Sequence, residues 1–234
     1  MIDIHCHILP GLDDGPASPI EALSMARQAV QDGVRHVIAT PHFNQKYRVK
    51  RDAVLTAVKQ FQRELDRNKI DLTVHPGNEV RLEDADKFED DLQNNKFCLL
   101  NDGTRYLLLE QHWLGYNEDT PDLIRRLSLR GITVIVPHPE RHFFFREVPA
   151  LLDQLIAAGA WTQVSADSLR GANGLDARDF AYRLLERNQV HTLATDAHNM
   201  TRKPNLSVAY ELVEEAAGRE RADEIRRRMK DIIR

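Results

Sequence analysis

Short hydrophobic runs alternate with longer amphipathic stretches along the whole chain. Apolar runs of strand length predict strands at residues 2–5, 36–40, 72–75, 106–110, 132–137, 161–165 and 190–195. Helical periodicity predicts helices at about 18–32, 51–68, 83–92, 121–130, 149–158 and 176–188. The sequence Ser18, Pro19, Glu21 is typical of a capped helix start, and Gly33 is typical of a helix end.

Seven strands separated by helices predict an α/β protein with a parallel sheet. A closed or nearly closed (β/α)7 barrel accommodates seven such units in 234 residues, and an open doubly wound sheet is the alternative. No Gly/Ser-rich linker interrupts the chain, so we expect a single domain over residues 1–234.

The segment 219–234 has the pattern of an amphipathic helix, since Ala222, Ile225, Met229 and Ile232 are spaced by three, four and three residues. We expect this helix to pack against the barrel. A dimer contact and a membrane-surface role are alternatives.

The composition excludes several classes of protein. With 42% hydrophobic and 29% charged residues, the chain matches ordinary globular proteins. Its net charge of −4 gives no general positive field, so we expect no nucleic-acid partner. The sequence shows no signal peptide and no apolar run of membrane-spanning length, and we expect a cytoplasmic protein without membrane insertion. The two cysteines are too few for a disulfide framework.

Histidine and acidic residues gather just past the predicted strand ends, where a barrel carries its chemistry. Nine residues share this placement: His5, His7, Asp14, His42, Glu79, Glu110, His138, Asp196 and His198. A single residue of this kind is more often solvated than ligated, but nine at one end of a barrel predict a metal site. The histidines at positions 36, 75, 112, 142 and 191 show no such convergence and are interpreted as structural or rim residues.

The types of ligand narrow the choice of metal. His5 and His7, two residues apart on a strand, point to the same side, with Cys6 on the other. Imidazoles and carboxylates without thiolate favour manganese, iron or zinc. Nine ligands could hold three divalent ions if a carboxylate bridges, leaving positions for water and substrate. We expect manganese, with iron or zinc as alternatives.

The sequence of residues 1–15, MIDIHCHILPGLDDG, resembles the start of bacterial tyrosine-protein phosphatases of the polymerase-and-histidinol-phosphatase (PHP) superfamily, the CpsB/CapC family of capsule and exopolysaccharide operons. The resemblance continues through IATPH at 38–42, GNEVR at 77–81, YLLLE at 106–110, VPHPER at 136–141 and ATDAHN at 194–199. It implies a distorted (β/α)7 TIM-like barrel, the PHP fold, and a protein-tyrosine phosphatase that regulates capsule synthesis.

The resemblance also implies a role for each candidate residue. One ion would be held by His5, His7, Glu79 and Asp196, a second by Glu79, Glu110 and His138, and a third by Asp14, His42 and His198. Arg141 and Arg202 match arginines that hold the phosphate. The chain departs from the family at Gln111–Leu114, where relatives have an aromatic residue and a proline, so Trp113 either stacks on a phenyl ring or packs in the loop.

A metal-bridging hydroxide is expected to attack phosphorus while the arginines bind the phosphoryl oxygens. Asp196 and His198 are the nearest residues for proton handling, although a ligand role suits them better. A cysteine mechanism is excluded because the sixth residues after Cys6 and Cys98 are Leu12 and Thr104, where such enzymes have arginine.

Other interpretations stay open at this point. The expected substrate is a phosphotyrosine protein, the tail of a bacterial tyrosine kinase. The alternatives are a small-molecule phosphoesterase such as histidinol phosphatase, and a non-catalytic metal-binding regulatory module. A homo-oligomer is possible on this sequence. Lys46, Arg48, Lys50 and Arg51 form either a positive rim or the solvated start of a helix.

Overall fold

Parallel strands form the centre of the protein in the computed structural model, which describes residues 1–234. One sheet has the order β1-β2-β4 and the other the order β3-β5-β6-β7-β8-β9. The bounds are β1 Ile2–Cys6, β2 His36–Ala39, β3 His42–Phe43, β4 Thr73–Pro76, β5 Glu79–Arg81, β6 Tyr106–Glu110, β7 Thr133–Pro137, β8 Trp161–Ser165 and β9 Thr192–Ala194.

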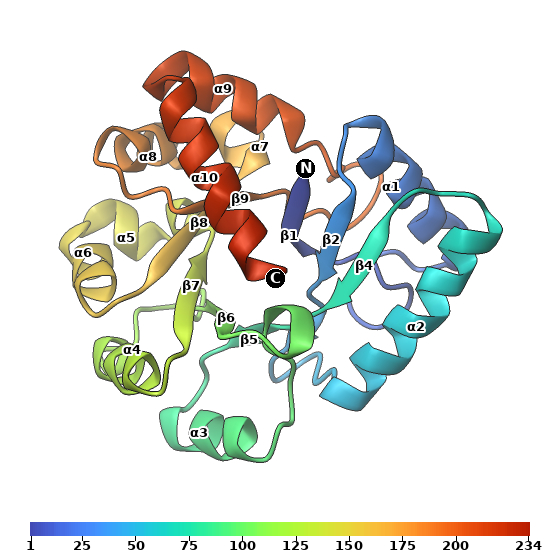
Figure 1. Ribbon diagram of the computed structural model, residues 1–234. Coiled ribbons are helices and arrows are strands. Elements are labelled where there is room, and N and C mark those ends of the chain that lie inside the picture. The colour runs from blue at the N-terminus through green and yellow to red at the C-terminus, as the bar shows by residue number, and fades with distance from the viewer.

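The seven predicted strands are all present, and the structure adds β3 and β5. The barrel prediction implied one continuous ladder of seven hydrogen-bonded strands. The structure instead divides the strands between two sheets. The sheets approach each other after β1 and β9, where Cys6 forms an isolated parallel bridge with Ala197. The parallel α/β class is therefore confirmed, with the strands arranged in two parallel sheets at the centre of the molecule (Figure 1).

Helices surround the strands (Figure 1). Their bounds are α1 Pro19–Gln31, α2 Arg51–Arg67, α3 Ala85–Gln93, α4 Thr120–Leu129, α5 Phe143–Glu147, α6 Ala150–Ala157, α7 Ala166–Leu169, α8 Leu175–Glu186, α9 Ser207–Ala217 and α10 Arg219–Ile232. Two 3-10 turns, Leu100–Asp102 and Pro139–Arg141, complete the set. The seven predicted helices, including the one at 219–234, are present as α1, α2, α3, α4, α6, α8 and α10, whereas α5, α7 and α9 were not predicted.

The first helix shows how local chemistry sets an element. Ser18 caps α1, since its hydroxyl accepts from the Glu21 amide at 3.3 Å, and Pro19 occupies the first turn. The Glu21 carboxylate accepts from the Ala17 amide at 3.0 Å. The chain leaves the helix through Gly33, which has φ +93°, a conformation that glycine adopts readily. The predicted start and end are both confirmed.

The hydrophobic interior is one cluster of 61 buried residues. The last four residues of β1, β6, β7 and β8 are all buried, as expected for parallel strands covered on both faces. Since the strands are fixed along their length, the residues that follow their carboxyl ends are held in defined positions.

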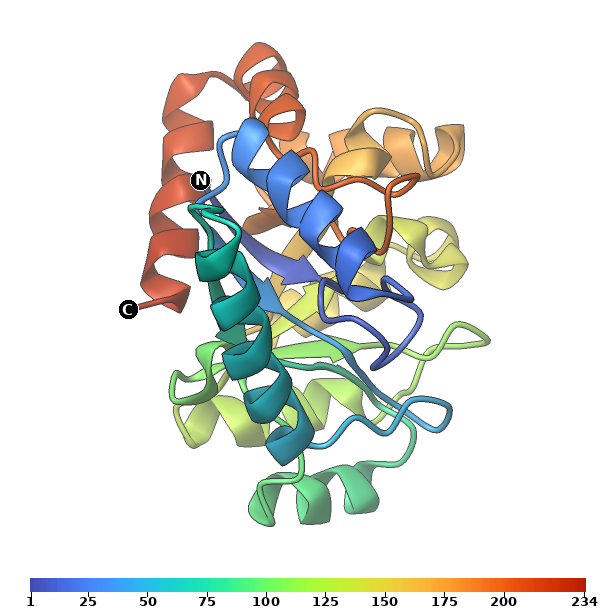
Figure 2. The ribbon, with the colours of Figure 1, turned by 90° about the vertical axis from the view of Figure 1, so that its right-hand side faces the viewer.

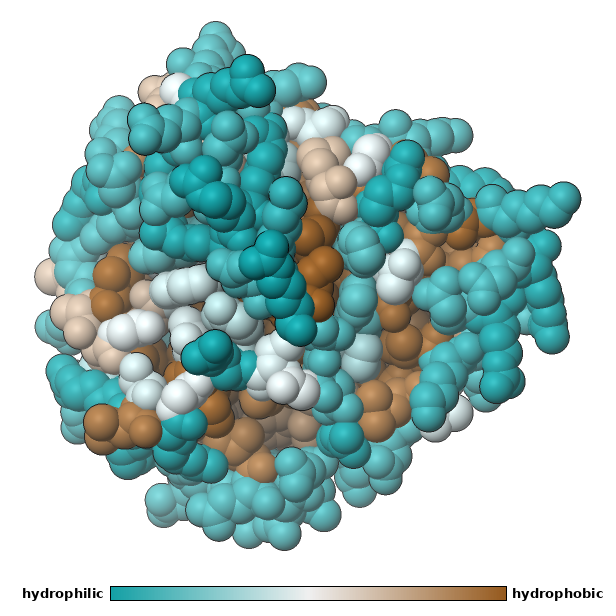
Figure 3. Space-filling model, viewed as in Figure 1, coloured by the Kyte–Doolittle hydropathy of each residue, from teal (hydrophilic) through white to brown (hydrophobic).

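Helix α10 lies across the amino ends of the strands, opposite the loops that follow the strands (Figure 2). Its buried residues include Ala222, Ile225, Met229 and Ile232, and it contacts β1 and β9, so the predicted packing of this helix against the body of the protein is confirmed. Hydrophilic side chains cover most of the face that carries this helix, with hydrophobic surface in the hollows beside it (Figure 3). None of the helices has both the length and the apolar character that crossing a membrane requires.

Candidate metal centre

The nine predicted ligands meet at the carboxyl end of the strands. A pocket of about 190 Å³ has among its lining residues Asp14, His42, Glu79, Glu110, His138, Asp196 and His198. His5 and His7 do not line this pocket, but ion-pair contacts of 3.3–3.6 Å join them to Glu79 and Asp196. Residues separated by up to 193 positions along the chain therefore share one site.

His5 and His7 form the buried base of the site. Their Nε2 atoms lie 3.2 Å apart. His5 Nδ1 donates to Gln163 Oε1 at 2.8 Å, and His7 Nδ1 donates to the Asp13 carboxylate at 2.6 Å. These bonds leave the two Nε2 lone pairs facing each other. Ligands on one ion at bonds of about 2.1 Å are separated by about 3.0–3.4 Å, so the pair fits a shared cation.

Glu79 lies at the centre of the cluster. Its carboxylate is 2.9 Å from His42 Nδ1, 2.9 Å from His138 Nε2 and 3.4 Å from His7 Nε2. Burial, together with the charge of Glu79, raises the pKa of Glu110 to about 7. Glu79 and Glu110 each place a carboxylate oxygen within 4.8 Å of the other, and two buried carboxylates at such a distance need positive charge between or beside them. Arg81 supplies part of it, since its Nε donates to Glu110 at 2.7 Å.

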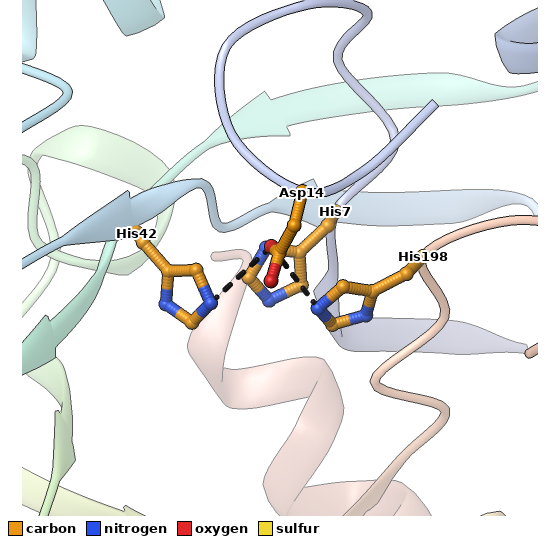
Figure 4. A group of neighbouring side chains, drawn as sticks. All are labelled: His7, Asp14, His42 and His198. Atoms are coloured by element: carbon orange, nitrogen blue, oxygen red, sulfur yellow. Dashed lines mark ion pairs between the residues drawn. The ribbon is translucent and has the colours of Figure 1, made fainter. Parts of the chain in front are cut away.

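A further group of ligands lies closer to the solvent (Figure 4). The Asp14 carboxylate is 3.4 Å from His42 Nε2 and 3.5 Å from His198 Nε2. The Asp14 side chain is 45% exposed, whereas the two histidines are largely buried. His7 joins this group, because the four residues each place a ligand atom within 4.8 Å of the others.

The protonation of the ligands suits a divalent ion. Burial lowers the pKa of His138 to about 4 and that of His198 to about 3, so both imidazoles are neutral at pH 7 and can donate a lone pair. Burial alone would lower the pKa of His5, but the charges of Glu79 and Asp196 raise it. The two carboxylates therefore favour positive charge at this position, which a divalent ion would also supply.

The loops that carry His138 and Asp196 have an unusual backbone. Both residues lie at positive φ, +36° for His138 and +51° for Asp196. Histidine and aspartate are among the residues that enter the left-handed region more readily than most. The strand end before Asp196 is held by buried Asp3, which accepts from the Thr195 amide at 3.1 Å and from its hydroxyl at 2.5 Å.

Both predicted phosphate-binding arginines face the site. Arg141 Nη1 and Arg202 Nη2 each lie 2.6 Å from Asp196 Oδ2. These charges, together with His5 and His198, overcome the effect of burial and lower the pKa of Asp196. The guanidinium group of Arg141 also lies 5.1 Å from the centre of the Trp113 ring. Trp113 lines the pocket. Of its two predicted roles, the structure therefore favours a side chain that faces the site over one that packs inside the loop.

Of the two interpretations of Lys46, Arg48, Lys50 and Arg51, the positive rim is only partly present. Arg48 pairs with Asp91 at 2.6 Å and Arg51 with Asp102 at 2.8 Å, so two of its four charges are neutralised. The hydrogen bonds that orient the ligands were not predicted. Asp13 had only its place next to the predicted ligand Asp14 as a sequence signal, and Gln163 had none.

The cysteines stay outside the chemistry, as predicted. Both are free and buried. Burial raises the pKa of each thiol, which disfavours the nucleophilic thiolate.

Comparison with known proteins places this arrangement in a family. Residues 1–233 match the family described as capsular polysaccharide synthesis, CpsB/CapC. The chain is 39% identical over 222 residues to the tyrosine-protein phosphatase YwqE of Bacillus subtilis, covering 94% of this chain and 86% of the relative. It is 27% identical to the tyrosine-protein phosphatase CpsB of Streptococcus agalactiae, covering 96% of this chain and 94% of the relative.

Solved structures agree with the sequence comparison. A match from work on YwqE of B. subtilis and CpsB of Streptococcus pneumoniae, described as metal-dependent tyrosine phosphatases, has a TM-score of 0.95 and 37% identity over 100% of this chain and 94% of that chain. The phosphotriesterase of Mycobacterium tuberculosis has a TM-score of 0.54 and 12% identity over 91% of this chain and 85% of that chain, which shows a likeness of fold alone.

Proposed function

The chain belongs to the CpsB/CapC family of capsular polysaccharide synthesis, and we propose that it uses the centre described above as a metal-dependent tyrosine-protein phosphatase. The observation that carries this proposal is the facing pair of His5 and His7 Nε2 atoms, 3.2 Å apart and bordered by Glu79 and Asp196. Four ligand atoms that attract the same cation explain why so many ionisable groups are buried together.

We assign three divalent ions to the centre, with manganese as the expected metal. The first would be held by His5, His7, Glu79 and Asp196, the second by Glu79, Glu110 and His138, and the third by Asp14, His42 and His198. The groups of neighbouring ligand atoms support this division, because Asp14, His42 and His198 belong to one group, His5, His7 and Asp196 to another, and Glu79 to two further groups with His138 and with Glu110. When bound, such ions neutralise phosphoryl oxygens and lower the pKa of a coordinated water.

The protein's own residues would bind and orient the phosphate ester. Arg141 and Arg202 present guanidinium groups to the pocket, and this planar donor suits phosphate oxygens. The carboxylate of Asp196 between them fixes both arginines before substrate arrives. Phenolate, with an ordinary pKa of about 10, leaves more readily than an alkoxide, so a strong general acid is not required. Asp196 and His198 are accordingly assigned to metal binding first and to proton handling second.

The substrate that we propose is phosphotyrosine on a bacterial tyrosine autokinase, and its removal would regulate capsule or exopolysaccharide synthesis. Two features support this assignment: the names of the relatives and the family to which the chain belongs. We further propose that residues 1–234 act as one catalytic domain with the distorted seven-unit barrel of the PHP superfamily.

The test combines metal analysis with two substrates. Asp196→Ala and His138→Ala are expected to lose bound metal and hydrolysis of a phosphotyrosine peptide while keeping the circular dichroism spectrum of the fold. His36→Asn, a histidine variant at the other end of the strands, serves as the control and should keep both. Chelation should abolish activity and Mn²⁺ should restore it. Retained activity in the ligand variants, or a higher kcat/KM for histidinol phosphate than for the peptide, would contradict the proposal.

A further inference from the structure

A second pocket adjoins the metal centre. Trp113 and Arg141 line both the metal-centre pocket of about 190 Å³ and a neighbouring pocket of about 490 Å³. The rest of the second pocket is formed by Arg146, Asn173, Gly174, Leu175, Asp176 and Ala177. A polypeptide that places a phosphorylated side chain in the first pocket therefore has the second within reach.

Trp113 is the only hydrophobic side chain that lines the metal-centre pocket. Its ring stacks on His142, with centroids 4.4 Å apart, and lies under the guanidinium group of Arg141. His142 is buried and therefore supports the ring from within the protein. A phenyl group entering the first pocket has Trp113 as its apolar surface, and the chain attached to it is directed along the same wall.

Exposed apolar side chains occur in and next to the chain segments that line the second pocket. The protein exposes six large hydrophobic residues, and only Ile20 and Leu129 lie away from this pocket in the sequence. Leu175 lines the pocket and is 63% exposed. The other three, Leu114, Phe143 and Val148, are each within two residues of a lining residue. Single exposed apolar residues need no explanation, but Leu175 exposes its side chain in the wall of a pocket, and together with Trp113 and Ala177 it gives that wall an apolar part.

The walls of the second pocket are held by hydrogen bonds to the interior. Asn173 Nδ2 donates to Ser168 Oγ at 3.0 Å, which anchors the loop before α8. Arg146 Nη1 donates to the Glu140 carbonyl at 3.0 Å, which joins α5 to the turn that carries Arg141. The apolar side chain of Leu175, the first residue of α8, is thereby presented on a fixed support.

We propose that this second pocket binds an apolar side chain of the substrate polypeptide within two residues of the phosphotyrosine. The inference rests on the proposed function, because the first pocket must hold the phosphotyrosine. Consecutive residues of an extended chain advance about 3.3 Å, so a residue one or two positions away reaches a pocket that shares a wall with the first. The second pocket thus sets which phosphotyrosines the enzyme prefers.

The test compares phosphopeptides that differ only beside the phosphotyrosine. Leucine, aspartate or glycine is placed at each of the two positions on either side, and p-nitrophenyl phosphate serves as a substrate without flanking residues. At one position, leucine should raise kcat/KM about 10-fold over glycine, mainly through KM. Leu175→Ser should lower the ratio of kcat/KM for that peptide to kcat/KM for p-nitrophenyl phosphate by about 5-fold. Leu129→Ser, an equally drastic change at a leucine that is 90% exposed on α4, should leave the ratio unchanged.

Three results would overturn the proposal: equal rates for leucine and glycine at all four positions, a preference for aspartate that points to Arg146 instead, or a ratio unaffected by Leu175→Ser. The failure of the proposed function looks different. In that case the metal-loaded wild-type protein hydrolyses none of the phosphotyrosine substrates, with or without flanking residues.

Discussion

The two ends of the strands are built in opposite ways. At the carboxyl end, buried histidines and carboxylates crowd into one site, and several of them have pKa values far from the ordinary ones. At the amino end, α10 covers the strands with Ala222, Ile225, Met229 and Ile232, all essentially unexposed. The same strands thus end in a polar cluster on one side and in an apolar contact on the other.

This difference separates the sources of activity and stability. Apolar burial at the amino end favours the folded state with or without a metal. The cluster at the carboxyl end brings like charges together, and such a cluster favours folding only when cations balance it. Substitutions at one end should therefore change catalysis, and substitutions at the other should change the free energy of unfolding.

The largest effect is expected for Glu79→Gln. The carboxylate at the centre of the cluster contacts four histidines, so its loss should lower kcat/KM about 10³-fold or more. Saturating Mn²⁺ should raise the Tm of the wild-type protein and have little effect on that of the variant. Kinetics and thermal unfolding measure both results. Glu64→Gln on α2 is the surface control and should keep full activity. If the Glu79→Gln enzyme were active, the metal centre would not be the site of catalysis.

Ile225→Ala should affect stability and leave catalysis nearly intact. The side chain is fully buried in α10, so we expect the free energy of unfolding to fall by about 2–4 kcal/mol. Urea unfolding measures the change, and Arg227→Ala on the exposed face of the same helix should cost less than about 0.5 kcal/mol. If the folded Ile225→Ala protein lost activity at saturating Mn²⁺, the two ends would be coupled and the comparison would fail.

Asp13→Asn tests whether the residues that orient the ligands matter for the metal. The Asp13 carboxylate holds Nδ1 of His7, and a neutral amide accepts that hydrogen bond more weakly. We expect metal affinity to fall about 10- to 100-fold, with kcat recovering in excess Mn²⁺. Metal titration monitored by activity gives the affinity. Asp71→Asn, at an exposed carboxylate, is the control and should leave the metal affinity unchanged. If Asp13→Asn also left the affinity unchanged, the residues that orient the ligands would not matter for metal binding.

The smallest effect concerns His191, near the amino end. Burial and the nearby charges of Arg228 and Arg221 lower the pKa of His191 to about 4. Between pH 6.5 and 4 the unfolded chain therefore binds a proton that the folded chain does not. The contribution of neutral His191 to the free energy of unfolding is therefore fully present above pH 6.5 and is lost as the pH falls toward 4. We expect this loss to be about 1–2 kcal/mol, less than a fully buried ring would give, because the ring keeps some contact with solvent.

The difference between wild-type and His191→Asn unfolding free energies at pH 7 and pH 4.5, both in chelator, isolates this contribution. A difference that does not change with pH would assign the pH dependence to other groups.

The sequence predicted what depends on local pattern. Strand 106–110 and the apolar positions of α10 follow from periodicity, and the structure confirms both. It did not predict β3 and β5, because strands of two and three residues carry no periodicity and exist through pairing with each other and with β6. The sequence also did not predict helix α9, which directly precedes the more regular amphipathic pattern of α10.

The candidate site shows the same division. Ligand types at strand ends are visible in the sequence, since their meeting follows from the fold class. The supporting contacts are not visible, because Gln163 is 158 residues from His5 and its role depends on the register of β8 beside β7. Likewise, only the folded chain pairs Arg48 with Asp91 and removes that charge from the rim.

The positive φ angles at His138 and Asp196 limit how this centre can be redesigned. Asparagine, aspartate and histidine enter that backbone region more readily than β-branched residues, for which it is an outlier. Cysteine is not among the residues enriched in that region, so inserting thiolates at these two positions to retune the site toward a softer metal would strain both loops, while His5 in its strand could be exchanged without that obstacle. The variety of metals accessible to engineered descendants is thus constrained first by main-chain geometry and only then by ligand chemistry.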